Sequence, residues 1–136
     1  DQVVMVNRQS EEKYRHPLTN IVYMGMGEPL LAYRNVLESL EHITSPEGLN
    51  MSPKRITVST AGIAKMIRKL ADDDVKFNLA ISLHAPDPGL RRALMPIEER
   101  YPLEAVLEAA EAYEALLATG VDRRRRRVVI EQELGA

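Results

Sequence analysis

The apolar residues of the chain fall into short compact runs, separated by longer segments in which they recur every three or four positions. The compact runs lie at 21–24, 55–60, 77–84 and 127–131. Short apolar runs that are rich in β-branched residues and bounded by turn residues are typical of strands in a parallel sheet. The pattern therefore predicts four strands, and the first of them is expected to be buried.

The intervening segments have the spacing of amphipathic helices. Residues 33–43, 61–70 and 102–117 each place their apolar side chains on one helical face. Asn35 is a candidate for an early N-cap of the first of these helices. A shorter helix is expected within residues 1–14, which begin with an apolar stretch and become polar.

Strands that alternate with helices along a chain form βαβ units, in which the crossovers are right-handed and the strands parallel. At 136 residues the chain is long enough for one domain. A closed eight-stranded barrel of such units takes about 200 residues or more. The expected fold class is therefore α/β, made of parallel (β/α) units.

Composition excludes several functional classes. With 18 basic and 20 acidic residues the net charge is −2, so any binding to nucleic acid or to a membrane would have to be local. The absence of cysteine excludes iron–sulfur ligation and cysteine nucleophiles within this sequence. Because the sequence has neither a long apolar segment nor a signal-peptide pattern, a cytoplasmic location is expected.

Candidate binding residues occur where three of the predicted strands end. Gly27 and Glu28 follow the first strand, Ser59 ends the second, and Ser82 and His84 end the third. Ligands of parallel α/β proteins bind at the carboxyl ends of the strands, so these side chains are placed for binding. A carboxylate such as that of Glu28 can accept charge-assisted hydrogen bonds from a ligand ammonium group.

Each of these residues also has an ordinary structural explanation. Glu28 can interact with the dipole at a helix start, Ser59 and Ser82 can cap the helices that follow, and His84 can be a loop residue. The five consecutive arginines at 123–127 likewise allow two interpretations. They can contact RNA phosphates, or they can form a solvated loop before the last strand.

Three motifs, taken in order, resemble a known family of enzymes. They are NIVYMGMGEPLL at 20–31, RITVSTAG at 55–62 and NLAISLHAP at 78–86, followed by MPI at 95–97 and YPL at 101–103. Together they resemble the radical S-adenosylmethionine (SAM) enzymes that methylate C2 of an adenine in 23S ribosomal RNA and in tRNA. The similarity extends over nearly the whole chain.

The resemblance implies part of a radical SAM (β/α) barrel that holds SAM at its strand ends. In the family, the carboxylate of a Gly-Glu-Pro motif contacts the SAM amino group, a serine ends the next strand, and a further segment lines the SAM pocket. By position, the SAM-binding residues expected here are Gly27, Glu28, Ser59, Ser82, Leu83 and His84.

The sequence departs from the family in its lack of cysteine. The family's [4Fe–4S] cluster needs three cysteines, its methyl transfer needs two more, and this chain has none. We therefore expect residues 1–136 to be one internal fragment of the barrel domain, without the first strand and its cluster loop and without the later strands. Such a fragment would hold no metal, contribute no catalytic residue and be inactive by itself.

The resemblance implies 23S rRNA and tRNA as partners of the parent enzymes. Three alternatives remain open from the sequence. The parent could be one of the relatives that methylate adenine C8. The chain could instead be a non-catalytic half-barrel that self-associates, or binds a partner, through exposed strand edges. Finally, the arginines at 123–127 could make it an RNA-binding module.

Overall fold

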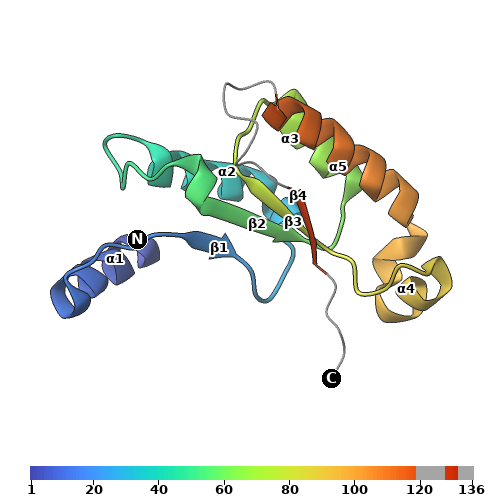
Figure 1. Cartoon of the computed structure of the whole chain (residues 1–136), viewed down its shortest axis with the longest axis horizontal. Coiled ribbons are helices and arrows are strands. Elements are labelled where there is room, and N and C mark those ends of the chain that lie inside the picture. Colours follow the sequence, from blue (N-terminus) through green and yellow to red (C-terminus); the bar gives the residue numbers. More distant parts are fainter. Residues whose placement is uncertain (119–127, 132–136) are drawn as a thin grey trace.

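A computed structural model describes residues 1–118 and 128–131 of the chain (Figure 1). The helices are α1 (Gln2–Tyr14), α2 (Tyr33–Thr44), α3 (Ala64–Asp72), α4 (Pro88–Leu94) and α5 (Leu103–Ala118). The strands are β1 (Ile21–Tyr23), β2 (Ile56–Thr60), β3 (Asn78–Ser82) and β4 (Val128–Glu131), and 3₁₀ turns cover Pro29–Ala32, Pro53–Arg55 and Pro96–Glu99. In the part of the chain described, no helix is long and apolar enough to cross a membrane.

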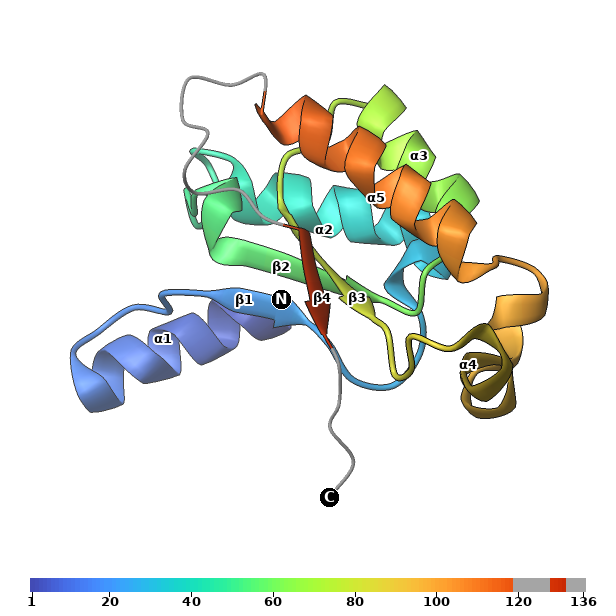
Figure 2. The same ribbon diagram turned by 45° about the vertical axis from the view of Figure 1, so that its right-hand side comes forward.

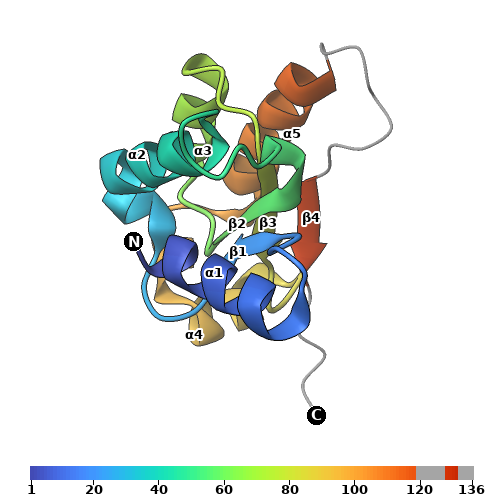
Figure 3. The same ribbon diagram turned by 90° about the vertical axis from the view of Figure 1, so that its left-hand side faces the viewer.

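The described strands form one parallel sheet in the order β1-β2-β3-β4. Helices α2, α3 and α5 lie together on one side of it, and α1 lies next to the edge strand β1 (Figures 1 and 3). Consecutive parallel strands with their crossover helices on one face are the arrangement found in a (β/α) barrel, where the helices surround the strands. The predicted parallel (β/α) units are confirmed.

Alternating burial along β2 identifies the two faces of the sheet. Ile56 and Val58 are fully buried, whereas Ser59 is only half-buried on the opposite face. Ser59 pairs with Ala80 of β3, and Ser82 lies two residues further along that strand. Side chains two residues apart share a face of a strand, so Ser59 and Ser82 lie on the same side of the sheet, away from the buried face.

The burial predicted for the first strand was wrong on one face. Ile21 and Tyr23 are half-buried, but Val22 is 52% exposed and Met24, just after the strand, is 60% exposed. Continuous apolar strands are expected where both faces of a sheet are covered. Among the described residues, β1 pairs only with β2. Association through strand edges, one of the alternatives left open by the sequence, remains a prediction.

The start of α2 also differs from the prediction. The helix begins at Tyr33, directly after the 3₁₀ turn Pro29–Ala32, so Asn35 lies inside its first turn. The turn is capped by Glu28, whose side chain accepts a hydrogen bond from the Leu30 N–H. Because this turn continues directly into α2, the helix does not need Asn35 as its cap.

The core joins α3 and α5 to the sheet. Leu70 of α3 and Val106 and Tyr113 of α5 are fully buried. The Tyr113 hydroxyl donates a hydrogen bond to the Phe77 carbonyl at 2.9 Å and accepts one from the Phe77 N–H at 3.2 Å. These bonds fix α5 to the segment that enters β3. This segment lies at the amino-terminal end of β3, and the candidate binding residues lie at the carboxyl ends of the strands.

A tyrosine links α2 to the end of α3. The Tyr33 hydroxyl donates a 2.7 Å hydrogen bond to Asp73, which also accepts hydrogen bonds from Lys69. Burial, followed by the hydrogen bond to Asp73, raises the pKa of Tyr33 well above its ordinary value of 10.0. The hydrogen bonds from Lys69 and Tyr33 lower the pKa of Asp73.

This contact predicts a loss of stability in alkali. The folded state favours the protonated Tyr33 phenol, while in the unfolded state the phenol ionises near its ordinary pKa of 10.0. The stabilisation is complete below about pH 10 and is lost as the pH rises towards the higher folded pKa. In urea unfolding at pH 8 and pH 11, we expect a larger fall in stability for the wild type than for Tyr33→Phe. Equal falls would contradict the assignment.

Candidate binding site at the strand ends

A cavity of about 240 Å³ lies where β1, β2 and β3 end. Figure 2 shows the ends of β2 and β3 on the side of the sheet where α4 lies. Five of the six SAM-binding residues predicted from the sequence line this cavity: Gly27, Glu28, Ser59, Ser82 and His84. The sixth, Leu83, is not among the lining residues, and its backbone carbonyl accepts a 3.2 Å hydrogen bond from Arg91.

A larger hollow of about 950 Å³ lies between α1, β1 and α2. Its lining includes Val3, Val4, Val22 and Ile43, and none of the six predicted residues contributes to it. Binding sites are recognised by a few convergent polar groups as well as by volume. The smaller cavity at the strand ends is therefore the candidate site.

Glu28 is held by three hydrogen bonds. Its Oε1 accepts one from the Leu30 N–H at 3.0 Å and one from the Thr60 hydroxyl at 2.8 Å. Its Oε2 accepts one from the Ala61 N–H at 2.7 Å. A carboxylate has about four acceptor positions, so one position on Oε2 remains for a ligand. The capping role considered for Glu28 is real, and it leaves part of the carboxylate available.

The loop that carries Glu28 depends on glycine for its backbone shape. Gly25 and Gly27 have φ values of 141° and 91°, which side-chain-bearing residues rarely adopt. A Cβ atom on Gly27 would meet no other atom within 4 Å. Backbone conformation, and not crowding, is therefore the reason for glycine at position 27.

The two serines do not cap the helices that follow them. α3 begins after Ile63 without a side-chain cap, and α4 is capped by Asp87, which accepts a 2.7 Å hydrogen bond from the Leu90 N–H. Within the part of the chain that the structure describes, neither the Ser59 nor the Ser82 hydroxyl has a hydrogen-bond partner. Both hydroxyls are half-buried at the cavity and can bind a ligand.

His84 adopts a strained backbone conformation at the cavity wall. Its φ is 58°, in the left-handed region, where histidine is more common than most side-chain-bearing residues. The next residue, Ala85, is buried, and its N–H donates a 2.7 Å hydrogen bond to the Leu83 carbonyl. Such conformations cost about 1–3 kcal/mol and concentrate at ligand-binding sites.

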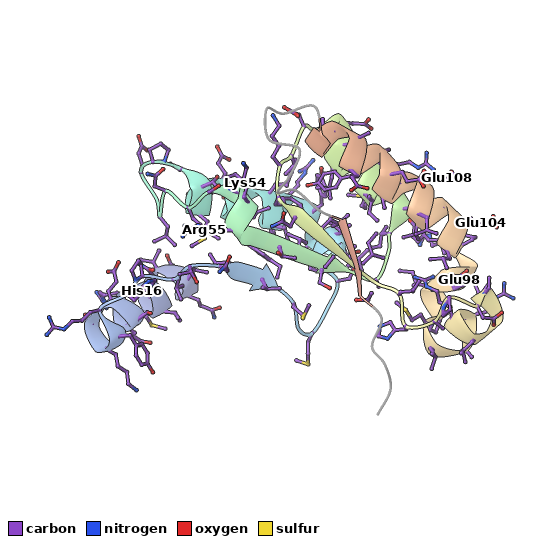
Figure 4. The ribbon with its side chains drawn as sticks, in the orientation of Figure 1. His16, Lys54, Arg55, Glu98, Glu104 and Glu108 are labelled. Carbon is purple, nitrogen blue, oxygen red and sulfur yellow. The ribbon has the colours of Figure 1, made fainter. Side chains whose placement is uncertain are left out.

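A buried ion pair, which the sequence did not predict, lies between α4 and the start of α5. Arg91 and Glu98 are 0% and 3% exposed and form a salt bridge. The Arg91 guanidinium also donates to the Leu83 and Ala61 carbonyls, and Glu98 accepts from the Leu103 N–H at 3.0 Å. In Figure 4, Glu98 lies where α4 and α5 approach each other. The pair joins two strand ends to the start of α5.

Thr60 is the other contributor that was missed. It is 1% exposed, its hydroxyl donates to Glu28, and the same oxygen accepts a 3.1 Å hydrogen bond from the Gly62 N–H. The motif at 55–62 includes Thr60, but residue type alone does not distinguish its hydroxyl from that of the neighbouring Ser59. The alternation of strand faces does distinguish them, because Thr60 points to the buried face.

The cavity fits part of SAM and does not fit an iron–sulfur cluster. SAM carries an ammonium, a carboxylate and ribose hydroxyls, which match the Glu28 carboxylate and the Ser59 and Ser82 hydroxyls that line the cavity. The volume of about 240 Å³ is below the roughly 300–1,000 Å³ of complete ligand pockets. A [4Fe–4S] cluster needs thiolates, and the sequence contains no cysteine. The described residues also contain no metal-binding group of three or more His, Asp or Glu.

Comparisons with known proteins agree with the motifs. No protein-family model matches the chain. Curated proteins named probable dual-specificity RNA methyltransferase RlmN do match it. The protein from Christiangramia forsetii is 56% identical over 111 residues, covering 82% of this chain and 32% of that protein. The protein from Cytophaga hutchinsonii is 57% identical over 109 residues, covering 80% and 30%.

A solved structure matches as well. The crystal structure of a radical SAM methyltransferase from Sphaerobacter thermophilus superposes with a TM-score of 0.85 at 38% identity, covering 96% of this chain and 36% of that protein. The chain thus spans about a third of the length of the relatives that it matches. The parallel (β/α) units are those of the radical SAM fold, and the chain belongs to the RlmN-like family of radical SAM methyltransferases.

Proposed function

We propose that this chain provides part of the SAM-binding site of an RlmN-type RNA methyltransferase. The proposal depends mainly on one observation: Glu28, which keeps one open acceptor position, lines the same cavity as two serine hydroxyls that have no partner among the described residues. In enzymes of this type SAM supplies the methyl group and the cluster supplies an electron. The residues of this chain have the simpler tasks of binding and orienting SAM.

Each polar residue has a distinct role in this proposal. Glu28 accepts a charge-assisted hydrogen bond from the SAM ammonium, a contact about twice as strong as a neutral one. Ser59 and Ser82 hydrogen-bond to ribose or carboxylate oxygens from the face of the sheet opposite to the helices. His84 forms part of the wall, and the glycine loop lets the backbone approach the ligand.

We further propose that residues 1–136, an internal part of one barrel domain, neither assemble a [4Fe–4S] cluster nor methylate RNA alone, because the sequence supplies no thiolate. The action on 23S rRNA and tRNA, the preference for adenine C2 over C8 and a cytoplasmic location belong to this proposal for the whole protein. The name of the relatives, dual-specificity RNA methyltransferase RlmN, supports the action on RNA. The choice of RNA and of the adenine position is supported only by the resemblance of the motifs at 20–31, 55–62 and 78–86. The arginines at 123–127, a candidate RNA-binding segment in the sequence, lie outside the described residues.

Calorimetric titration of the chain with SAM tests the proposal. We expect weak binding by the wild type and about tenfold weaker binding by Glu28→Gln, which removes the charge at the ammonium site. The control is Glu104→Gln, an equal change of charge on the exposed side of α5, which should leave the affinity unchanged (Figure 4). Absence of binding by the wild type, or equal effects of the two variants, would contradict the assignment.

A further inference from the structure

A hydrogen-bond relay connects the buried Arg91 to Glu28. The Arg91 guanidinium donates to the Ala61 carbonyl at 3.0 Å. At the other end of that peptide group, the Gly62 N–H donates to the Thr60 hydroxyl at 3.1 Å. The Thr60 hydroxyl then donates to Glu28 Oε1 at 2.8 Å. Every donor in the relay points the same way, from the positive guanidinium to the negative carboxylate.

Burial of its donor residues strengthens the relay. Arg91 and Thr60 are 0% and 1% exposed, so the donor groups of the first and last bonds are shielded from solvent. Hydrogen bonds arranged head to tail in a low-dielectric interior polarise one another. A second bond, from the Ala61 N–H to Glu28 Oε2 at 2.7 Å, fixes the other carboxylate oxygen. Residues 60–62 are thus held between Arg91 on one side and Glu28 on the other.

Arg91 is itself fixed from the opposite side. Glu98 neutralises its charge and is anchored in turn by the Leu103 N–H at the start of α5. Burying two charges costs several kcal/mol per ion, and apolar replacements of such pairs are often neutral or stabilising. Stability alone is therefore a poor explanation for a buried pair at this place. Its contacts lead directly to the residues that line the cavity.

We propose that Arg91 is a positioning residue, which fixes residues 60–62 through the relay and so orients the Glu28 carboxylate toward the cavity. Glu98 keeps Arg91 neutralised and in place. What Glu28 binds rests on the function proposed above. The positioning itself can be measured without a ligand.

Amide hydrogen exchange by NMR on the whole chain tests the positioning. In Arg91→Met we expect exchange at the Ala61 and Gly62 amides to rise about tenfold more than at Leu79, which reports opening of the sheet. Tyr113→Phe is the matched control, because it also removes buried hydrogen bonds but at the opposite end of the sheet. It should increase exchange at Phe77 without a selective effect at Ala61 and Gly62. A uniform rise in Arg91→Met would overturn the proposal.

Arg91→Lys carries the same test if Arg91→Met does not fold. Lysine keeps the positive charge beside Glu98 but cannot hold the Leu83 and Ala61 carbonyls together as the planar guanidinium does. Selective exchange at the Ala61 and Gly62 amides is again the expected result. The proposal would again be overturned if the exchange rates of these two amides rose by the same factor as that of the Leu79 amide.

SAM titration separates the positioning from the proposed function. We expect about tenfold weaker binding in Arg91→Lys, and no further loss when that change is added to Glu28→Gln, since both act on one carboxylate. The positioning would be overturned if the double variant lost affinity by the product of the two single losses. It would also be overturned if Glu28→Gln weakened SAM binding while Arg91→Lys left it unchanged. If the wild type binds no SAM while exchange is selective, the proposed function fails and the positioning stands.

Discussion

Glu98→Leu should destabilise the chain by about 3–5 kcal/mol, because it leaves the fully buried Arg91 guanidinium without its counter-charge. The same change removes the acceptor of the Leu103 N–H at the start of α5. Domains of this size are stable by about 5–15 kcal/mol, so the loss would be a large part of the total. Urea unfolding followed by circular dichroism measures it as a lower midpoint with an unchanged slope.

Two further variants show whether the buried charge is the cause. Arg91→Met/Glu98→Leu removes both charges and should recover about 2 kcal/mol, since an uncompensated buried charge costs more than an apolar pair. Recovery should be incomplete because the Leu83 and Ala61 carbonyls lose their donor. Glu108→Gln, which breaks the exposed pair with Arg68, should cost less than about 1 kcal/mol. The explanation fails if the double variant is no more stable than Glu98→Leu.

The secondary structure was predictable because its signals are local. The compact runs and the three-to-four spacing each depend on a few neighbouring residues, and they predicted the four strands and helices α1, α2, α3 and α5 to within a few residues. The short helix α4 was not predicted. Burial of β1 was not predictable in the same way. An apolar run shows that a strand can be buried on both faces, but Val22 is exposed because coverage depends on which elements lie beside it.

The candidate site was predictable for a related reason. Parallel strands bring their carboxyl ends to one edge, so residues 27, 28, 59, 82 and 84 could be expected to meet without knowledge of any contact. Arg91 and Thr60 could not be found this way. Their partners, Ala61 and Glu28, lie 30 and 32 residues away, and nothing in the sequence marks one arginine among many as buried.

Gly62→Ala should be the second most damaging change, at about 3 kcal/mol. Gly62 has a φ of 99°, where a side-chain-bearing residue is strained by about 1–2 kcal/mol. Its Cβ would also lie 3.0 and 3.1 Å from the two Val106 methyl groups and 3.5 Å from the Arg91 guanidinium. Crowding in a close-packed core adds about 1–3 kcal/mol. The free energy of unfolding in urea measures the total.

Gly27→Ala separates the two contributions, because Gly27 has a similar φ of 91° but open space where its Cβ would lie. It should therefore show the backbone strain alone, about 1–2 kcal/mol. The difference between the two variants measures how closely α5 packs on the end of β2, next to the relay from Arg91. If both variants lose the same stability, the Val106 side chain moves aside from the new Cβ without a loss of stability. The Arg91 guanidinium is then held by its hydrogen bonds and not by the packing around Gly62.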